Sequence, residues 1–400
     1  LTGEASVGPA TQELGLVIGD LVNTASRLQS IAEPGTVVVG EATRRMLTDA
    51  IEFAPMGSHL LKGKAAPVAV WRAETVIVDR SQSRSHRREP AFVGRIEELR
   101  ILKDAVHASE RVGRSKLVSI IGEAGIGKSR LVRELGRYVA SLASPIYWHE
   151  GRSPAYGQGL TFWALGEMVR QRAGIAATDD GVRSRTKLRT AVAEYVPSLS
   201  DQSWIEPRLA ALLGLEDAPG DEPNEFFAAV RSFFEHISDR GTVVMVFEDF
   251  HWADRGLIEF VDQLAKRSTR HPIVVLTLAR PDLLEKAPGW GSGGRNTTSV
   301  HLGPLSDPEM GELVRAMVQG IAEDVVGVVV ERASGIPLYA VELVRMLLAD
   351  GELVAHEGAC TPVGDLSAVR VPDTVLAVVA ARLDRLEKPM RALIQDAAVL

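Results

Sequence analysis

The sequence contains a single cysteine, Cys360, among its 400 residues. One thiol excludes a disulfide framework and a metal site made of several cysteines, and it is typical of a reducing compartment. Long hydrophobic runs are missing as well. The apolar stretches, such as residues 325–330, are far shorter than the roughly 20 residues that a membrane-spanning helix needs. We therefore expect a cytoplasmic protein without a membrane partner.

An excess of positive charge is also absent. Lys and Arg number 45 against 52 for Asp and Glu, which gives a formal net charge of −7. No overall basic field would hold the chain on nucleic acid, so we expect DNA contact only through a domain outside this chain. Hydrophobic residues make up 46% of the sequence, enough for several domains of about 100–200 residues each. The sequence starts at Leu1 and stops at Leu400 within a helical pattern, so we expect a fragment.

Strand and helix signals first alternate and then stop. Residues 1–75 carry strand patterns at 36–39 and 68–71 together with helical stretches, which predicts part of a small α/β domain. Residues 76–91 include the run DRSQSRSHRREP, which is polar, basic and aperiodic. Such a composition is typical of a solvated linker, with contact to nucleic acid as the alternative.

The pattern of strand, loop and helix repeats over residues 92–303. It predicts an α/β fold with a parallel sheet that helices flank on both faces. The expected strands are at residues 116–121, 145–149, 243–247, 273–279 and 299–302. One helical stretch has an apolar face that we interpret as core, made of Phe226, Phe227, Val230, Phe233, Phe234 and Ile237. Residues 287–298 predict a flexible loop, and the chain turns mainly helical from residue 304.

A glycine-rich loop stands between the first of these strands and a helix pattern. The segment IIGEAGIGKSRLV has the spacing G-x-x-x-x-G-K-S. Its glycines let backbone N–H groups surround phosphates, its lysine reaches the terminal phosphates, and its serine hydroxyl binds Mg²⁺. The loop therefore predicts binding of a nucleoside triphosphate, namely ATP with Mg²⁺. The predicted nucleotide-binding residues here are Gly122, Gly125, Gly127, Lys128, Ser129 and Arg130.

Two acidic residues follow directly after another strand pattern. Glu248 and Asp249 come after the run VVMVF, so they emerge at the carboxyl edge of the sheet, where α/β folds bind ligands. One carboxylate can hold Mg²⁺, and the other can polarise an attacking water. We assign Glu248 to the metal and Asp249 to the water. Both are candidate metal ligands beside Ser129, and the alternative is a pair of solvated acids.

Five segments in a fixed order resemble the STAND branch of AAA-type ATPases, the signal-transduction NTPases. They are FVGR, GEAGIGKSR, VFEDFHWAD, LTLARPD and SGIPLYAVEL, within residues 90–400. The resemblance implies that Val93 lies against the nucleotide base, that Arg280 senses the γ-phosphate, and that Pro337 brings a helical lid to the nucleotide. It also implies slow hydrolysis that serves as a switch. The lid would span residues 304–371, and the start of a winged-helix region 372–400.

Residues 1–75 resemble the C-terminal part of a class III nucleotidyl cyclase domain, through VIGDLVNTASRLQ, PGTVVVGEATRRML and LKGKAAPVAVWRA. In that family the positions of Asn23 and Arg27 orient the ribose and stabilise the α-phosphate, and Lys62 resembles a lysine near the triphosphate. The family's two metal-binding aspartates lie upstream of this segment, so this chain alone should not cyclise ATP. Leu16 also departs from the polar residue that the family uses for purine selection.

The joined segments lead to two functional hypotheses. In the first, an ATPase switch that uses ATP and Mg²⁺ controls an adenylate cyclase in the intact protein. In the second, ATP is held without appreciable hydrolysis, the cyclase domain is degenerate, and the output is oligomerisation or transcriptional regulation. In either case we expect a homo-oligomer formed through both domains and a protein partner that the sequence does not identify.

Overall fold

The computed structural model describes residues 27–28, 31–32, 36–41, 43–44, 51–59, 67–76, 90–154, 162–176, 179–216, 223–291, 294, 296–356 and 359–362. These residues belong to two compact units, which divide the chain into residues 1–89 and 90–400. Among the described residues, none of the helices combines the length and apolar character that crossing a bilayer requires. The expected winged-helix region at 372–400 lies outside the described residues.

The first unit contains an antiparallel sheet with the strand order β1-β3-β2. Its strands are β1 (Val37–Gly40), β2 (Ile51–His59) and β3 (Val68–Val76). β3 lies in the centre, and its Val70 packs with Leu28 in a small core. The strands predicted at residues 36–39 and 68–71 are thus confirmed as parts of β1 and β3.

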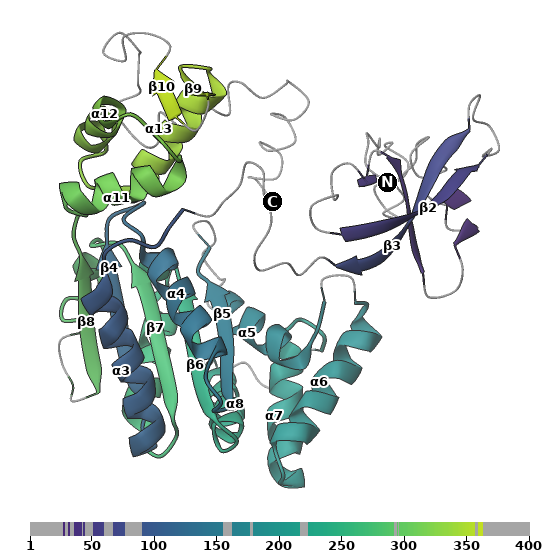
Figure 1. Ribbon diagram of the computed structural model, residues 1–400. Coiled ribbons are helices and arrows are strands. Elements are labelled where there is room, and N and C mark those ends of the chain that lie inside the picture. The colour runs from purple at the N-terminus through teal and green to yellow at the C-terminus, as the bar shows by residue number, and fades with distance from the viewer. Residues whose placement is uncertain are drawn as a thin grey trace, which may run out of the picture. The chain divides into compact units, whose positions relative to one another are not determined.

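The second unit is built on a parallel sheet of five strands with the order β5-β6-β7-β4-β8 (Figure 1). The strands are β4 (Lys116–Gly122), β5 (Ile146–Arg152), β6 (Thr242–Glu248), β7 (Ile273–Ala279) and β8 (Thr297–Leu302). All five predicted strands are therefore confirmed. Alternate residues of the central strands point to opposite faces, and both faces are buried. This explains why these strands appear as continuous apolar runs.

Helices cover both faces of this sheet. One face packs against α3 (Ile96–Val112) and α4 (Lys128–Ala140), which run along the sheet in Figure 1. The helices on the other face are α5 (Trp163–Ala173), α8 (Pro223–Ser238) and α9 (Arg255–Arg267), while α6 (Gly181–Tyr195) and α7 (Leu199–Leu212) pack against α5 and α8 and share the same core. The aromatic face predicted from the sequence lies on α8, where Phe233 and Phe234 are fully buried.

The edge strand β5 is covered by side chains of α5 instead of by another strand. The Gln171 amide donates to the Glu150 carbonyl and accepts from the Glu150 backbone N–H, both at 2.9 Å. Two positions along the strand, the Arg152 backbone N–H donates to the Glu167 carboxylate at 2.8 Å. These hydrogen bonds pair backbone N–H and C=O groups of β5 that an uncovered edge strand would offer to another chain.

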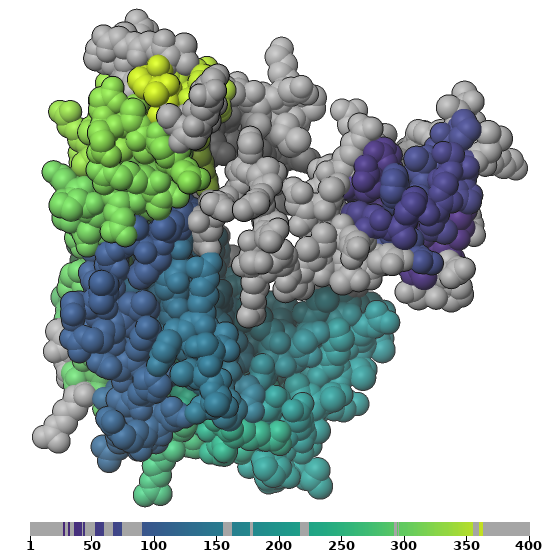
Figure 2. All heavy atoms as spheres, in the orientation of Figure 1, coloured from purple at the N-terminus to yellow at the C-terminus, as the bar shows by residue number. Residues whose placement is uncertain are grey.

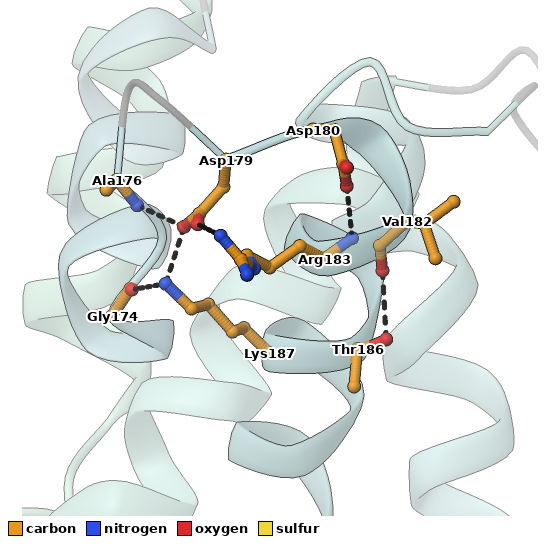
Figure 3. Close-up of polar contacts among 8 residues, drawn as sticks. All are labelled: Gly174, Ala176, Asp179, Asp180, Val182, Arg183, Thr186 and Lys187. Atoms are coloured by element: carbon orange, nitrogen blue, oxygen red, sulfur yellow. Dashed lines mark hydrogen bonds and ion pairs between the residues drawn. The ribbon is translucent and has the colours of Figure 1, made fainter. Parts of the chain in front are cut away.

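The start of α6 is tied to the end of α5 by a polar cluster (Figure 3). Asp180 caps α6, and the neighbouring Asp179 accepts hydrogen bonds from the Lys187 ammonium at 2.5 Å and the Ala176 backbone N–H at 2.7 Å. Lys187 also donates to the Gly174 carbonyl, at the C-cap of α5. The hydrogen bond from Lys187, followed by that from Ala176, lowers the pKa of Asp179. These hydrogen bonds therefore hold the start of α6 against the end of α5, within the helical segment between β5 and β6.

The segment at residues 287–298 is better packed than the sequence predicts. Trp290 is buried against the core of the α5–α9 face, and its indole N–H donates to the Ser119 hydroxyl at 3.1 Å. The described part of this segment therefore contributes a core residue, contrary to the predicted flexible loop.

A small helical body sits on the loop end of the sheet, and Figure 2 shows the two in direct contact. It consists of α11 (Asp307–Met317), α12 (Glu323–Ala333), α13 (Pro337–Ala349) and the hairpin of β9 (Leu353–His356) with β10 (Ala359–Pro362). It has its own hydrophobic core. We call α11–α13 with this hairpin the helical lid.

Candidate nucleotide-binding site

The predicted phosphate loop connects β4 to α4 in the second unit. Gly125 and Gly127 have φ angles of 77° and 107°, a left-handed backbone that favours glycine. Gly127 is the N-cap of α4, no side chain caps this helix start, and its first turn has no acidic residue. Backbone N–H groups and the positive end of the helix dipole are therefore available to an anion. The donor set fits a polyphosphate.

Lys128 is the first residue of α4, and the charges of other predicted site residues act on its ammonium group. Its ammonium donates to the carbonyls of Gly122 at 2.7 Å and Glu123 at 2.9 Å. Burial lowers the pKa of Lys128, Arg280 lowers it further, and Asp249 opposes both. Lys128 at the start of α4 is thus electrostatically coupled to Asp249, which follows β6, and to Arg280, which follows β7.

The two acids stand where the sequence predicts. Glu248 is the last residue of β6, and Asp249 begins the short 3-10 helix η1 (Phe250–Trp252). Asp249 has a φ of 51°, which is uncommon for a residue with a side chain. Phe250 anchors this turn because its ring is fully buried and packs on Trp290, with 5.1 Å between the ring centroids.

Arg152 faces both acids, and our sequence interpretation did not include it. β5 lies beside β6 with Arg152 opposite Glu248. The guanidinium is 3.0 Å from the Glu248 carboxylate and 3.3 Å from that of Asp249. The predicted strand ended at residue 149, three residues too early. A charged residue shortly after a predicted strand is the signal that could have found it.

The Val-Gly-Arg segment is attached to the helical lid. Val93 is buried in the lid core, and a side chain at Gly94 would collide with Glu309 of α11. The Arg95 guanidinium donates to the Gly303 carbonyl, at the entry to the lid. The segment before α3 therefore forms one surface with the lid.

Arg130, which we predicted to bind nucleotide, holds this same N-terminal segment. Its guanidinium donates to the Pro90 carbonyl at 2.6 Å and to Glu134 at 2.8 Å, and it lies 5.9 Å from the Phe92 ring centroid. In this arrangement Arg130 positions residues 90–92 along α4.

The lid touches the phosphate loop through the start of α13. Pro337 is the first residue of that helix, and the Leu338 backbone N–H donates to the Gly125 carbonyl at 3.2 Å. A Cβ atom at Gly125 would lie only 2.9 Å from Leu338 Cβ. On the other side of the Gly-x-Pro segment, the Gly335 carbonyl accepts from the Leu305 backbone N–H. The lid is thus fixed to the loop at one point and to its own entry at another.

Comparisons with known proteins agree with this geometry. The family profile described as AAA ATPase domain matches residues 91–276, which include the phosphate loop, Arg152 and both acids. A second profile, described as Adenylate and Guanylate cyclase catalytic domain, matches residues 7–74. The chain thus contains, in this order, a segment similar to part of a cyclase catalytic domain and a segment similar to an AAA ATPase domain.

One curated protein and two solved structures are among those that resemble this chain. An uncharacterized protein of Rhizobium meliloti (strain 1021) is 28% identical over 343 residues, which are 82% of this chain and 32% of that protein. This chain thus spans about a third of that relative. A STAND protein with a tetratricopeptide repeat sensor from Pyrococcus horikoshii aligns over 79% of this chain and 36% of its own, with 16% identity and a TM-score of 0.42. The Aeropyrum pernix ORC1 protein in complex with DNA aligns over 74% and 68%, with 14% identity and a TM-score of 0.47.

The ATPase domain has oxygen donors that suit Mg²⁺. Ser129 is exposed on the first turn of α4, and the carboxylates of Glu248 and Asp249 lie across the sheet edge. The described residues contain no group of three His, Cys, Asp or Glu side chains placed to hold a metal ion. This donor set fits Mg²⁺, which proteins bind through one or two oxygen ligands together with substrate phosphates and water.

Of the three predicted cyclase residues, only Arg27 is among the described residues. Arg27 lies half-buried in a helical turn beside Leu28, which packs against Val70. Asn23 and Lys62 lie outside the described residues. Their predicted proximity to Arg27 therefore stays a prediction.

Proposed function

We propose that the ATPase domain binds ATP with Mg²⁺ and uses binding and hydrolysis as a conformational switch that moves the helical lid. The observation that supports this most strongly is the hydrogen bond from the Leu338 backbone N–H to the Gly125 carbonyl. A ligand that reshapes the phosphate loop acts directly on the start of α13. The ordered motifs that resemble STAND ATPases support the same function.

Each predicted residue has a role in this proposal. Lys128 exchanges its loop carbonyl partners for the terminal phosphates, and Arg280 stabilises the charge on the γ-phosphate. Glu248 and Ser129 hold Mg²⁺, which would neutralise phosphate charge when bound. Asp249 orients the attacking water. Val93 and Pro337 bring the lid to the base side of the nucleotide.

We propose further that this switch controls an adenylate cyclase in the longer protein. The cyclase profile covers residues 7–74, and Arg27 lies within that range. Asn23, Arg27 and Lys62 would supply the ribose and phosphate contacts, while other parts of the protein supply the metal-binding aspartates. Homo-oligomerisation through both domains belongs to this proposal.

The second candidate is a switch that holds ATP without turnover. The observation that favours it is Arg152, because this cation occupies both carboxylates that hydrolysis would use. In that case the cyclase segment is degenerate, and nucleotide occupancy alone changes the lid.

Nucleotide binding and phosphate release measured side by side separate the two candidates. We expect Lys128→Ala to lose ATP binding and Asp249→Ala to bind ATP but release no phosphate. Lys266→Ala is the matched control, because Lys266 forms an exposed ion pair with Asp262 on α9. Tight retention of ATP without turnover in the unmodified chain would establish the second candidate. ATP binding that survives Lys128→Ala would refute both.

A further inference from the structure

Two side chains next to the site contain buried polar atoms that have no hydrogen-bond partner in the part of the chain that the structure describes. They are both ring nitrogens of His251 and the Oδ1 atom of Asp282. His251 is only 1% exposed. Buried polar atoms in proteins are nearly always paired with protein groups or ordered water. Three unpaired atoms in two residues therefore call for a physical explanation.

These residues belong to the two turns that present the catalytic groups. His251 lies in η1, two residues after Asp249, and Asp282 follows Arg280 by two residues at the start of α10 (Leu283–Lys286). The Lys286 ammonium donates to the His251 carbonyl at 2.7 Å and so joins the two turns.

Asp282 does not perform the usual task of an aspartate at a helix start. It occupies the N-cap of α10, but its backbone is helical, with φ −60° and ψ −18°, and its side chain makes no cap hydrogen bond. Its buried oxygen is therefore available to another group.

The charges around His251 are those of the nucleotide site. Asp282, Arg280, Asp249 and Lys128 all act on its ring, and burial is the main reason that the pKa of His251 is lowered. A neutral imidazole has one donor and one acceptor nitrogen. Neither nitrogen is bonded to Asp282, although η1 is in contact with α10, which Asp282 precedes.

We propose that His251 and Asp282 together bind one water molecule and through it position Arg280 and Asp249 for recognition of the γ-phosphate. The two nitrogens of one imidazole point in different directions, so this water would bond one ring nitrogen of His251 and the Oδ1 atom of Asp282, both of which are unpaired among the described residues. The inference rests on the proposed ATP-binding function and makes His251 and Asp282 positioning residues. It concerns recognition of ATP over ADP and does not require turnover.

A second buried histidine provides the matched control. His149 in β5 is also 1% exposed; backbone groups of Val244 and Tyr147 act on its ring, and no side chain of the described residues bonds its nitrogens. Its ring packs edge-on against Phe234 at 4.9 Å between centroids, and Arg172 is the one charged side chain that acts on its pKa. Loss of His149 thus reproduces the packing cost without touching the site.

The test compares dissociation constants for ATP and ADP in the full chain. We expect His251→Leu to lose about tenfold of the preference for ATP, the size of one hydrogen bond to a charged group, with ADP affinity unchanged. His251→Gln keeps a donor and an acceptor and should restore most of the preference. Asp282→Asn should act like His251→Leu, and His149→Leu should leave the preference intact.

The outcomes separate this inference from the proposed function. An unchanged ATP-to-ADP ratio in His251→Leu, or an equal loss in His149→Leu, would overturn the inference while nucleotide binding stands. A chain that binds neither nucleotide would overturn both. A high-resolution crystal structure gives an independent reading: a water within hydrogen-bond distance of His251 and Asp282 supports the inference, and a direct bond between the two side chains contradicts it.

Discussion

Arg152 offers the most direct perturbation of the acid pair. Replacing it with alanine removes the cation that lies 3.0 Å from Glu248 and 3.3 Å from Asp249, and leaves its backbone bond to Glu167 in place. The register of β5 and β6 therefore stays, and only the charge is lost. We expect Arg152→Ala to free both carboxylates for Mg²⁺.

The size of the effect follows from the exposure of the pair. The Arg152 side chain is 64% exposed, so a water-like dielectric applies, and two unit charges 3 Å apart then interact by about 1.4 kcal/mol. Measured exposed ion pairs contribute about 0.2–1 kcal/mol. The Mg²⁺ concentration for half-saturation should thus fall about 1.4- to fivefold, with about tenfold as the upper limit that the Coulomb figure sets. The melting temperature should change little, because such a pair adds little to stability.

The assay is a Mg²⁺ titration of ATP retention, with phosphate release followed in parallel, at low and at high salt. The gain in Mg²⁺ affinity should be larger at low salt, since salt screens exposed charges. Arg255→Ala is the control, because Arg255 forms an exposed pair with Glu259 on α9. Unchanged or weaker Mg²⁺ binding in Arg152→Ala would refute the view that this arginine competes with the metal.

Three further predictions concern the lid, acid stability and the sheet edge. Gly125→Ala should separate the lid from the phosphate loop, because the new Cβ atom meets Leu338 and φ at this position is positive. Gly113 has a similar φ and no neighbour near its Cβ position, so Gly113→Ala should leave the lid in place. Limited proteolysis of the lid compares the two variants. Burial lowers the pKa of His149 to about 3 from 6.5, so the free energy of unfolding falls by about 1.4 kcal/mol per pH unit below pH 6.5. In denaturant titrations, the free energy of unfolding of His149→Phe should depend less steeply on pH in this range. Equal slopes for the two proteins would contradict this. Gln171→Leu leaves backbone groups of β5 unpaired and should promote self-association in light scattering, an effect that Gln171→Glu should reduce.

The sequence predicts the sheet well because each central strand is buried on both faces. The run 243–247 has to be apolar throughout, and such a run followed by Glu248 and Asp249 identifies both the strand and its carboxyl edge. The glycine-rich loop is equally predictable, since Gly127 has a φ of 107° and a Cβ atom at Gly122 would lie only 2.9 Å from the Leu302 carbonyl oxygen.

The hydrophobic pattern of the sequence does not indicate which elements distant in sequence are in contact. Arg152 reaches Glu248 only because β5 is the neighbour of β6, and strand order is not encoded in local periodicity. Trp290 resembles a loop residue until its partner Ser119 is known. Likewise, Arg130 follows the phosphate loop in sequence, yet its guanidinium holds the carbonyl of Pro90.

The arrangement of the lid links nucleotide exchange to lid movement. Val93 is buried in the lid core, and Arg95 donates to Gly303 at the lid entry, so the surface predicted to meet the base packs against the lid. The phosphate loop stays with the sheet and is joined to the lid through Gly125 and Leu338. Under the proposed function, a nucleotide would therefore bridge two bodies that share few direct bonds. Opening the lid would remove the base contact and expose the phosphates in one step, so nucleotide release and proteolytic sensitivity of the lid should change in parallel.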